Sequence, residues 1–136
     1  MAVNKIIMFT DGGARGNPGP AGIGVVLYNK KKEKIAEVSK YLGIATNNQA
    51  EYRALIEGLK KAKELGAKEL EVFLDSELVV KQLNREYKVK NKDLAPLFLE
   101  VYNLSLSFSK IVFKHVYREE NKEADRLANE AMDFSK

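Results

Sequence analysis

The sequence predicts an α/β fold in which a five-stranded mixed sheet carries helices on both faces. The run Ile6–Phe9 lacks polar alternation, which is typical of a strand covered by helices on both sides. Residues 69–75 repeat the pattern of apolar residues followed by an aspartate. A helical segment at 46–65 separates these two strands, and such a long crossover makes them parallel neighbours in one sheet.

The remaining elements follow from local patterns. Segments 23–28 and 34–42 alternate as strands, and the polar turn 29–33 joins them into a hairpin. Gly22 and Gly24 indicate a bulge or a close backbone contact. Thr46 is the expected N-cap of the long helix, with Gln49 completing a capping box, and Gly66 ends that helix.

The second half of the chain predicts three helices and one strand. Segment 76–83 reads as a short helix and 93–107 as a longer one with an apolar stripe. Segment 110–117 is the fifth strand, and 119–134 is the last helix, with Asn121 as its expected cap. We predict a single domain over residues 1–136, since this length supports one core of ordinary size.

Composition excludes several classes of function. No apolar run approaches the roughly 20 residues of a membrane span, and the first residues lack a signal-peptide pattern, so we expect a cytoplasmic protein without membrane contact. The chain has no cysteine and one histidine, which argues against disulfides, thiolate catalysis and the usual zinc sites. A bound metal would need oxygen ligands, which favours magnesium or manganese. The net charge of +4 is consistent with a polyanionic partner but does not require one.

Acidic residues follow the ends of the two parallel strands. Asp11 and Asp75 are expected at the same sheet edge, where open α/β sheets usually bind ligands. Following strand directions places Glu51, in the first turn of the long helix, beside Asp11. Asp125 falls in the first turn of the last helix. Three of these acids also have a simpler interpretation: Asp11 before two glycines suits a turn, and Glu51 and Asp125 suit helix dipoles.

Two further segments suit contacts with phosphate. The stretch 12–20 is rich in glycine and proline, so we expect an irregular, tight connection with exposed backbone amides, or an ordinary hairpin turn. The link 84–92 is basic and carries Tyr87, which is typical of a phosphate-contacting surface and equally of a solvated loop.

Four motifs together resemble type 1 ribonuclease H: Thr-Asp-Gly-Gly-Ala-Arg-Gly-Asn-Pro-Gly-Pro at 10–20, Thr-Asn-Asn-Gln-Ala-Glu at 46–51, Asp-Ser at 75–76 and Asn-Lys-Glu-Ala-Asp at 121–125. The resemblance runs nearly end to end. It implies the ribonuclease H-like fold and a metal-dependent endonuclease that cleaves RNA in RNA/DNA hybrids, leaving 3′-hydroxyl and 5′-phosphate ends. It also implies two Mg²⁺ ions, with Mn²⁺ as an alternative, and a monomer without an obligate protein partner.

The resemblance assigns roles to individual residues. The metal-binding and catalytic acids would be Asp11, Glu51, Asp75 and Asp125. Asp11 would bridge the two ions, Asp125 would complete the site that activates water, and the other two would hold the ion beside the leaving oxygen. The substrate-contacting residues would be Gly12, Gly13, Arg15, Asn17, Thr46, Asn47, Asn48, Gln49, Ser76, Lys88 and Lys90.

The chain departs from the family pattern at two points. Many members carry a histidine on the loop before the last aspartate, whereas segment 117–120 holds none, so Arg118 is our candidate for that role. His115 lies within the predicted fifth strand, where a structural histidine is expected. Some members carry a basic, tryptophan-containing protrusion, which this chain lacks. Two other functions stay open: a hybrid-binding module without cleavage, and a nuclease of this fold acting on double-stranded RNA or DNA.

Overall fold

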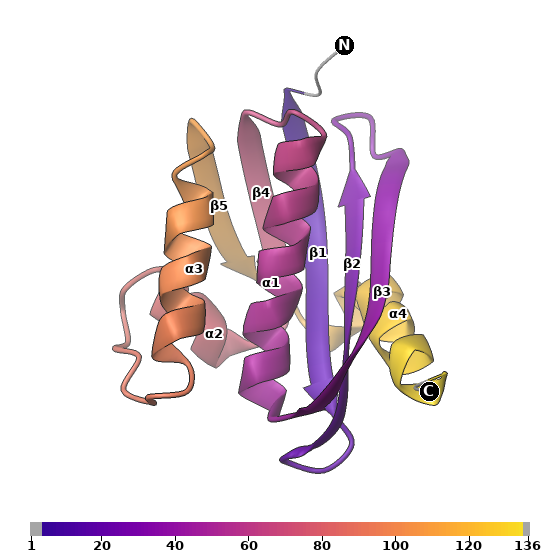
Figure 1. Ribbon diagram of the computed structural model, residues 1–136. Helices are drawn as coiled ribbons and strands as arrows, with labels where there is room; N and C mark the ends of the chain where they lie inside the picture. The colour runs from indigo at the N-terminus through magenta and orange to yellow at the C-terminus, as the bar shows by residue number, and fades with distance from the viewer. Residues whose placement is uncertain (1–3, 135–136) are drawn as a thin grey trace.

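The computed structural model describes residues 4–134, which fold around one five-stranded mixed sheet. Across the sheet the strands run in the order β3-β2-β1-β4-β5 (Figure 1). In chain order the elements are β1 (Lys5–Ala14), β2 (Gly19–Tyr28), β3 (Lys34–Ala45), α1 (Asn47–Glu64), β4 (Glu69–Leu74), α2 (Glu77–Leu83), α3 (Ala95–Ser105), β5 (Lys110–His115), the short 3-10 helix η1 (Arg118–Glu120) and α4 (Lys122–Asp133).

The central pair of strands confirms the predicted parallel arrangement. β1 and β4 pair in parallel with Phe9 opposite Phe73, and these two rings stack with centroids 5.1 Å apart. β2 and β3 extend the sheet on one side as antiparallel strands, and β5 adds a parallel strand on the other. Helices α1, α2 and α3 lie over one face and α4 over the other (Figure 1), so the predicted layers are correct.

The glycine-rich stretch 12–20 belongs to an ordinary hairpin, which was the alternative to an irregular connection. β1 continues to Ala14 and β2 begins at Gly19, so only residues 15–18 form the turn. The strands extend because glycine lets helices approach the backbone closely. A Cβ at Gly12 would overlap the carbonyl of Ala50, and a Cβ at Gly24 would overlap that of Ala124. The sheet therefore gains regular pairing at the positions where glycine content suggested a loop.

This extension corrects the expected position of Asp11. Asp11 pairs with Gly24 inside the β1–β2 ladder and does not end its strand. The parallel ladder with β4, in contrast, stops at Thr10 and Leu74. Asp11 therefore lies just beyond the last residue of β1 that pairs with β4. Asp75 lies at the corresponding position, directly after the end of β4. Because β1 and β4 are no longer paired at this point, both aspartates are accessible there, as they would be at the end of a strand.

Helix boundaries agree with the sequence in α1 and α2, the latter running over Glu77–Leu83 after its cap Ser76, and differ in α3 and α4. Thr46 caps α1 and forms the predicted capping box with Gln49. The predicted strand 110–117 ends earlier, at His115, and the predicted helix 119–134 splits into η1 and α4. Asn121 occupies the N-cap position of α4, but its side chain makes no capping hydrogen bond. That part of the prediction is wrong, because the amide of Asn121 is used elsewhere.

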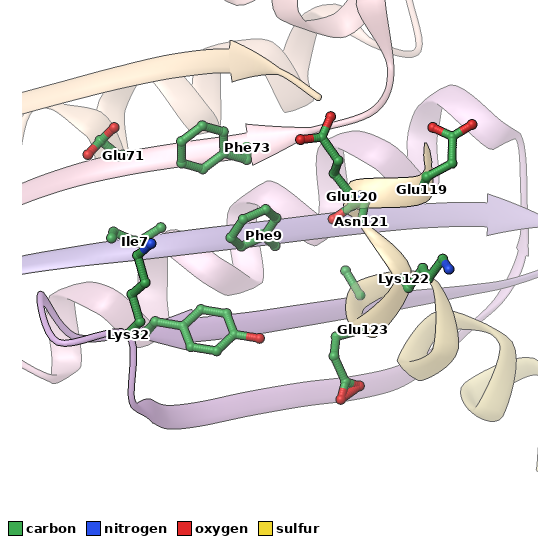
Figure 2. A pocket seen from close by; sticks show the side chains of 12 residues that line it. Ile7, Phe9, Lys32, Glu71, Phe73, Glu119, Glu120, Asn121, Lys122 and Glu123 are labelled. Atoms are coloured by element: carbon green, nitrogen blue, oxygen red, sulfur yellow. The ribbon is translucent and has the colours of Figure 1, made fainter. Parts of the chain in front are cut away.

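Helix α4 covers only part of its face of the sheet. Beside its start lies an apolar hollow of about 530 Å³, whose floor includes Phe9 and Phe73 (Figure 2). Tyr28 closes one side with its ring edge toward Phe9. Residues 119–124 form the opposite wall. No helix among residues 4–134 is long and apolar enough to cross a membrane.

Candidate active site

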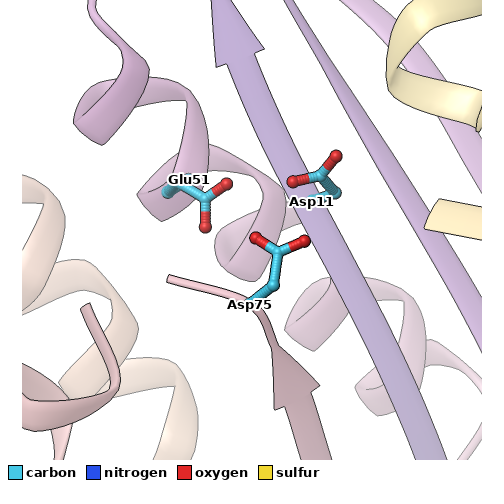
Figure 3. A group of neighbouring side chains, drawn as sticks. All are labelled: Asp11, Glu51 and Asp75. Carbon is cyan, nitrogen blue, oxygen red and sulfur yellow. The ribbon is translucent and has the colours of Figure 1, made fainter. Parts of the chain in front are cut away.

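Three carboxylates from distant parts of the chain meet at the edge of the sheet. Asp11 projects from β1, Asp75 follows the end of β4, and Glu51 lies in the first turns of α1. One oxygen from each lies within 4.8 Å of the others, and Figure 3 shows the three groups facing one another. The sequence-based prediction that these acids converge is therefore correct.

Glu51 is held deep in this cluster although it carries a charged group. Its side chain belongs to a residue that is only 6% exposed, and its Oε1 accepts a hydrogen bond of 2.9 Å from the backbone amide of Gly12. Its Oε2 is buried and has no partner within residues 4–134. A favourable helix-dipole interaction would not require this burial. A buried carboxylate oxygen without a hydrogen-bond donor is instead suited to bind a cation.

The electrostatics of the cluster point the same way. Burial first, and then the negative charge of Asp75, raise the pKa of Asp11 to about 7. Burial and the charge of Asp11 raise the pKa of Glu51 well above its ordinary value, although the Gly12 amide acts in the opposite direction. Carboxylates at this spacing repel one another unless a proton or a cation lies between them. Oxygen donors of this kind fit Mg²⁺ or Mn²⁺.

Asp125 approaches the cluster from the other face of the sheet. It lies in the first turn of α4, and contact with its carboxyl contributes to the raised pKa of Asp11. It is not one of the three acids that gather within 4.8 Å. All four acids line one open cleft of about 450 Å³, together with Gly12, Gly13, Ala14, Arg15, Asn47, Asn48, Ser76, Arg118, Ala128, Asn129 and Met132.

Two asparagines that touch the acids were missed as site residues. Asn121 is 1% exposed, and its Nδ2 donates to the carbonyl of Thr10 at 2.9 Å and to Oδ2 of Asp75 at 3.2 Å. Asn129 contacts Asp125 in the same way from α4. A helical spacing of four residues could have indicated Asn129. Nothing local in the sequence indicates that Asn121 reaches β1 and β4.

The predicted substrate-contacting residues divide into three groups. Gly12, Gly13, Arg15, Asn47, Asn48 and Ser76 line the acidic cleft. Asn17, Thr46 and Gln49 line an adjoining hollow of about 230 Å³, which Asn48 shares and to which the link between α2 and α3 contributes Asn91. Lys88 and Lys90 are exposed on that link and lie outside both linings. The first two groups form a continuous polar surface beside the acids.

Several of these residues also hold the backbone in place. Asn47 accepts a hydrogen bond from the amide of Ala14 at 2.8 Å, and the amide of Asn47 donates to Asn17 at 3.1 Å. These bonds tie the start of α1 to the β1–β2 hairpin. Ser76 caps α2 by accepting from Val79. The polar residues around the cleft thus fix α1 against the β1–β2 hairpin and begin α2 directly after Asp75.

The two candidates for the loop-histidine role occupy different places. Arg118 begins η1, is exposed and lines the acidic cleft. His115 is the last residue of β5 and is also exposed, with its ring edge-on to Tyr117 at 5.5 Å. The expectation of a structural histidine inside the strand is therefore wrong, because β5 is an edge strand and ends at this residue. His115 does not line the cleft.

The fold and the acidic cleft are those of the ribonuclease H class, and comparisons with known proteins agree. Residues 9–131 match the family described as "Reverse transcriptase-like". A ribonuclease H of Erythrobacter litoralis is 37% identical over 146 residues, which cover 97% of this chain and 99% of that protein. The chain belongs to the ribonuclease H family.

Other relatives and solved structures extend the likeness. The Bifunctional protein Rv2228c of Mycobacterium tuberculosis is 48% identical over 95% of this chain, which spans only 36% of that relative. The structure of RNase H1 from Halobacterium salinarum has a TM-score of 0.93, at 41% identity over 96% of this chain and 98% of that one. LC11-RNase H1, solved in complex with an RNA/DNA hybrid, has a TM-score of 0.90 at 47% identity, over 94% and 96% of the two chains.

Proposed function

We propose that this chain is a metal-dependent endonuclease that hydrolyses the RNA strand of RNA/DNA hybrids by a two-metal-ion mechanism, leaving 3′-hydroxyl and 5′-phosphate ends. The observation that carries this proposal is the convergence of Asp11, Glu51 and Asp75, with a buried and unpartnered oxygen on Glu51.

We propose the metal ligands from the positions of the acids and from the family resemblance. Asp11, at the centre, would contact both ions, while Glu51 and Asp75 would hold one and Asp125 would complete the other. Two Mg²⁺ ions bound there would activate a water molecule and stabilise the charge on the leaving oxygen. The protein's own contribution is to hold the four carboxylates along one cleft. Mg²⁺ is the ion that we propose, with Mn²⁺ as the alternative.

The residues that line the cleft support a nucleic-acid substrate whose backbone approaches the protein closely. Gly13 carries no side chain that would block the cleft, and Asn48 and Ser76 offer polar groups along the wall. RNA is distinguished from DNA by its 2′-hydroxyls, which polar side chains and backbone groups can contact across the minor groove. Hybrid as the substrate is further supported by LC11-RNase H1, whose structure contains an RNA/DNA hybrid.

A comparison of substrates tests the proposal. Labelled RNA/DNA hybrid, double-stranded RNA, double-stranded DNA and single strands are incubated with the protein in Mg²⁺, with Asp11→Asn as the inactive control. We expect cleavage of the RNA strand of the hybrid, and products that a ligase can join because they carry 5′-phosphates. Binding of hybrid without any cleavage would instead support the non-cleaving module. Faster cleavage of double-stranded RNA or DNA would assign the other substrate.

A further inference from the structure

Asn129 occupies a specific place between the acidic cleft and the β1–β2 turn. It lies four residues after Asp125 on α4, so the two side chains share a helix face. Its Nδ2 donates to the backbone carbonyl of Asp125 at 3.0 Å and to Oδ1 of the same residue at 3.3 Å. Asn129 also lines the cleft. One amide group therefore contacts both the backbone and the carboxylate of the acid on α4.

A cation fixes which way this amide points. Nη2 of Arg15 lies 3.4 Å from Oδ1 of Asn129 and 3.5 Å from its carbonyl oxygen, and it pairs with Asp133 at 2.6 Å. Arginine can only donate, so it selects the oxygen end of the amide. The nitrogen end is then left facing Asp125. If the amide were reversed, its oxygen would face a carboxylate and its nitrogen a guanidinium, and both contacts would be repulsive.

The amide is well suited to this position because it is neutral. The carboxyl of Asp125 shares the cleft with the like charge of Asp11 and accepts a hydrogen bond from Asn129. A lysine or arginine at position 129 would neutralise Asp125 and compete with a cation. An asparagine holds the carboxylate in one orientation and leaves its charge available. Groups that orient a metal ligand in this way commonly affect metal affinity or activity by 10- to 100-fold.

We propose that Asn129, oriented by Arg15, is a positioning residue that holds the Asp125 carboxylate in the orientation that completes the metal site. The inference rests on the proposed function. It also changes the part expected of Arg15, which would act from the β1–β2 turn on Asn129 of α4 and not by touching substrate. Two simpler explanations compete with it. In the first, Asn129 only stabilises its helix by donating to the backbone carbonyl of Asp125; in the second, Arg15 contacts the hybrid directly.

Binding of Mg²⁺ by Asn129→Ala, measured by calorimetry without substrate, provides the first test. We expect the affinity to fall about tenfold and the Mg²⁺ concentration for half-maximal cleavage to rise by a similar factor. The KM for hybrid should stay within about twofold of wild type. A residue that only supports the helix would lower the unfolding temperature and leave the Mg²⁺ dependence of the folded protein unchanged.

Two variants separate positioning from substrate contact. Asp133→Ala removes the partner that anchors Arg15 and lies outside the residues lining the cleft. We expect it to shift the Mg²⁺ dependence in the same direction as Arg15→Ala, by about threefold, because both loosen Asn129. If Arg15 served the hybrid directly, Arg15→Ala alone would raise KM and Asp133→Ala would have no effect.

Arg126→Ala is the matched control on the same helix. Arg126 is exposed and pairs with Glu123 and Glu130, away from the cleft. This variant should bind Mg²⁺ as the wild type does. In an Asp125→Asn background, Asn129→Ala should cause no further change in Mg²⁺ affinity.

Wild-type affinity in Asn129→Ala, or an equal loss in the Asp125→Asn background, would overturn the inference. The absence of hybrid cleavage by the wild type would instead overturn the proposed function.

Discussion

The backbone amide of Gly12 donates a hydrogen bond to Oε1 of Glu51, and this 2.9 Å contact joins the central strand to the first turns of α1. It forms because α1 approaches β1 so closely that a side chain at Gly12 would overlap the carbonyl of Ala50. Glycine at position 12 therefore affects the geometry of the acidic site. The close approach brings the carboxylate of Glu51 beside Asp11 and leaves its second oxygen without a partner among residues 4–134.

Gly12→Ala should destabilise the protein by about 1–3 kcal/mol, because the added methyl forces α1 away from β1. The same movement should weaken Mg²⁺ binding by displacing Glu51. Gly13→Ala is the matched control, since its Cβ would meet only the side chain of Asn47 at 3.8 Å, an ordinary contact. Urea unfolding of both variants provides the measurement. Equal stability of the two would show that the packing of α1 on β1 is not tight at Gly12.

The metal-free protein should lose stability as the pH rises from 5 to 8. The pKa of Asp11 rises from its ordinary 3.8 to about 7 in the fold, so the folded chain holds this proton more tightly than the unfolded chain. Its stabilising effect is complete below about pH 4 and is lost as the pH approaches 7. Glu51, whose pKa is also raised, acts in the same direction. We expect the unfolding temperature to fall by roughly 3–8 °C, about 1–2 kcal/mol.

Asp11→Asn distinguishes this effect from other titrations in the chain. The amide removes both a titrating group and a charge that repels Asp75, so the variant should exceed the wild type in stability at pH 8. Its pH dependence should be shallower, and saturating Mg²⁺ should reduce the wild-type dependence because the ions replace the protons. Thermal unfolding with and without Mg²⁺ measures both effects. Parallel pH curves for the two proteins would contradict the assignment to Asp11.

The sequence predicted the central features of the site because they depend on short-range periodicity. Phe9 and Phe73 each precede an aspartate by two residues, and strand alternation then places both aspartates at corresponding positions. The crossover helix made the strands parallel, and strand directions brought Glu51 to the same edge. These steps need only the alternation of strands and the length of connections, and the structure confirms each of them.

The features that the sequence did not predict depend on contacts between distant segments. Glycines normally interrupt strands, so β1 was expected to stop at Asp11, whereas helix packing makes Gly12 and Gly24 necessary within paired strands. Asn121 was expected to cap α4, but a buried carbonyl at Thr10, more than a hundred residues away, receives its amide instead. No local pattern encodes such a partner.

Hybrid binding should weaken as salt increases, because lysines that contact phosphates release counterions. Replacing Lys88 and Lys90 by alanine should make the slope of log affinity against log salt shallower by about one to two. Lys30→Ala with Lys31→Ala is the control of equal charge, since this exposed turn follows Tyr28 at the opposite end of the sheet from the cleft. Fluorescence anisotropy at several salt concentrations, in Ca²⁺ to prevent cleavage, gives the slopes. Identical slopes for both pairs would identify the link as a solvated loop.

Arg118 lines the cleft and is the residue that we propose in place of the loop histidine of the family pattern. It stays protonated near neutral pH and cannot act as a general base, so its contribution must come from its charge and its planar donors. From η1 it lines the same cleft as Asp125, where it can orient or release a cleaved phosphate. Arg118→Ala should lower turnover by roughly ten- to a thousandfold, about 1.4–4 kcal/mol in barrier, with stability nearly unchanged because the residue is exposed.

Two variants complete this test of Arg118. Arg118→Lys should restore only part of the lost turnover, because an ammonium lacks the bidentate fork of a guanidinium. His115→Ala should change neither turnover nor stability by much, about 0.5 kcal/mol at most, since this side chain is exposed and lies outside the cleft lining. Single-turnover and steady-state rates together separate phosphate release from chemistry. If His115→Ala abolishes turnover in a folded protein while Arg118→Ala remains active, the roles must be exchanged, and the end of β5 must approach the substrate during the reaction.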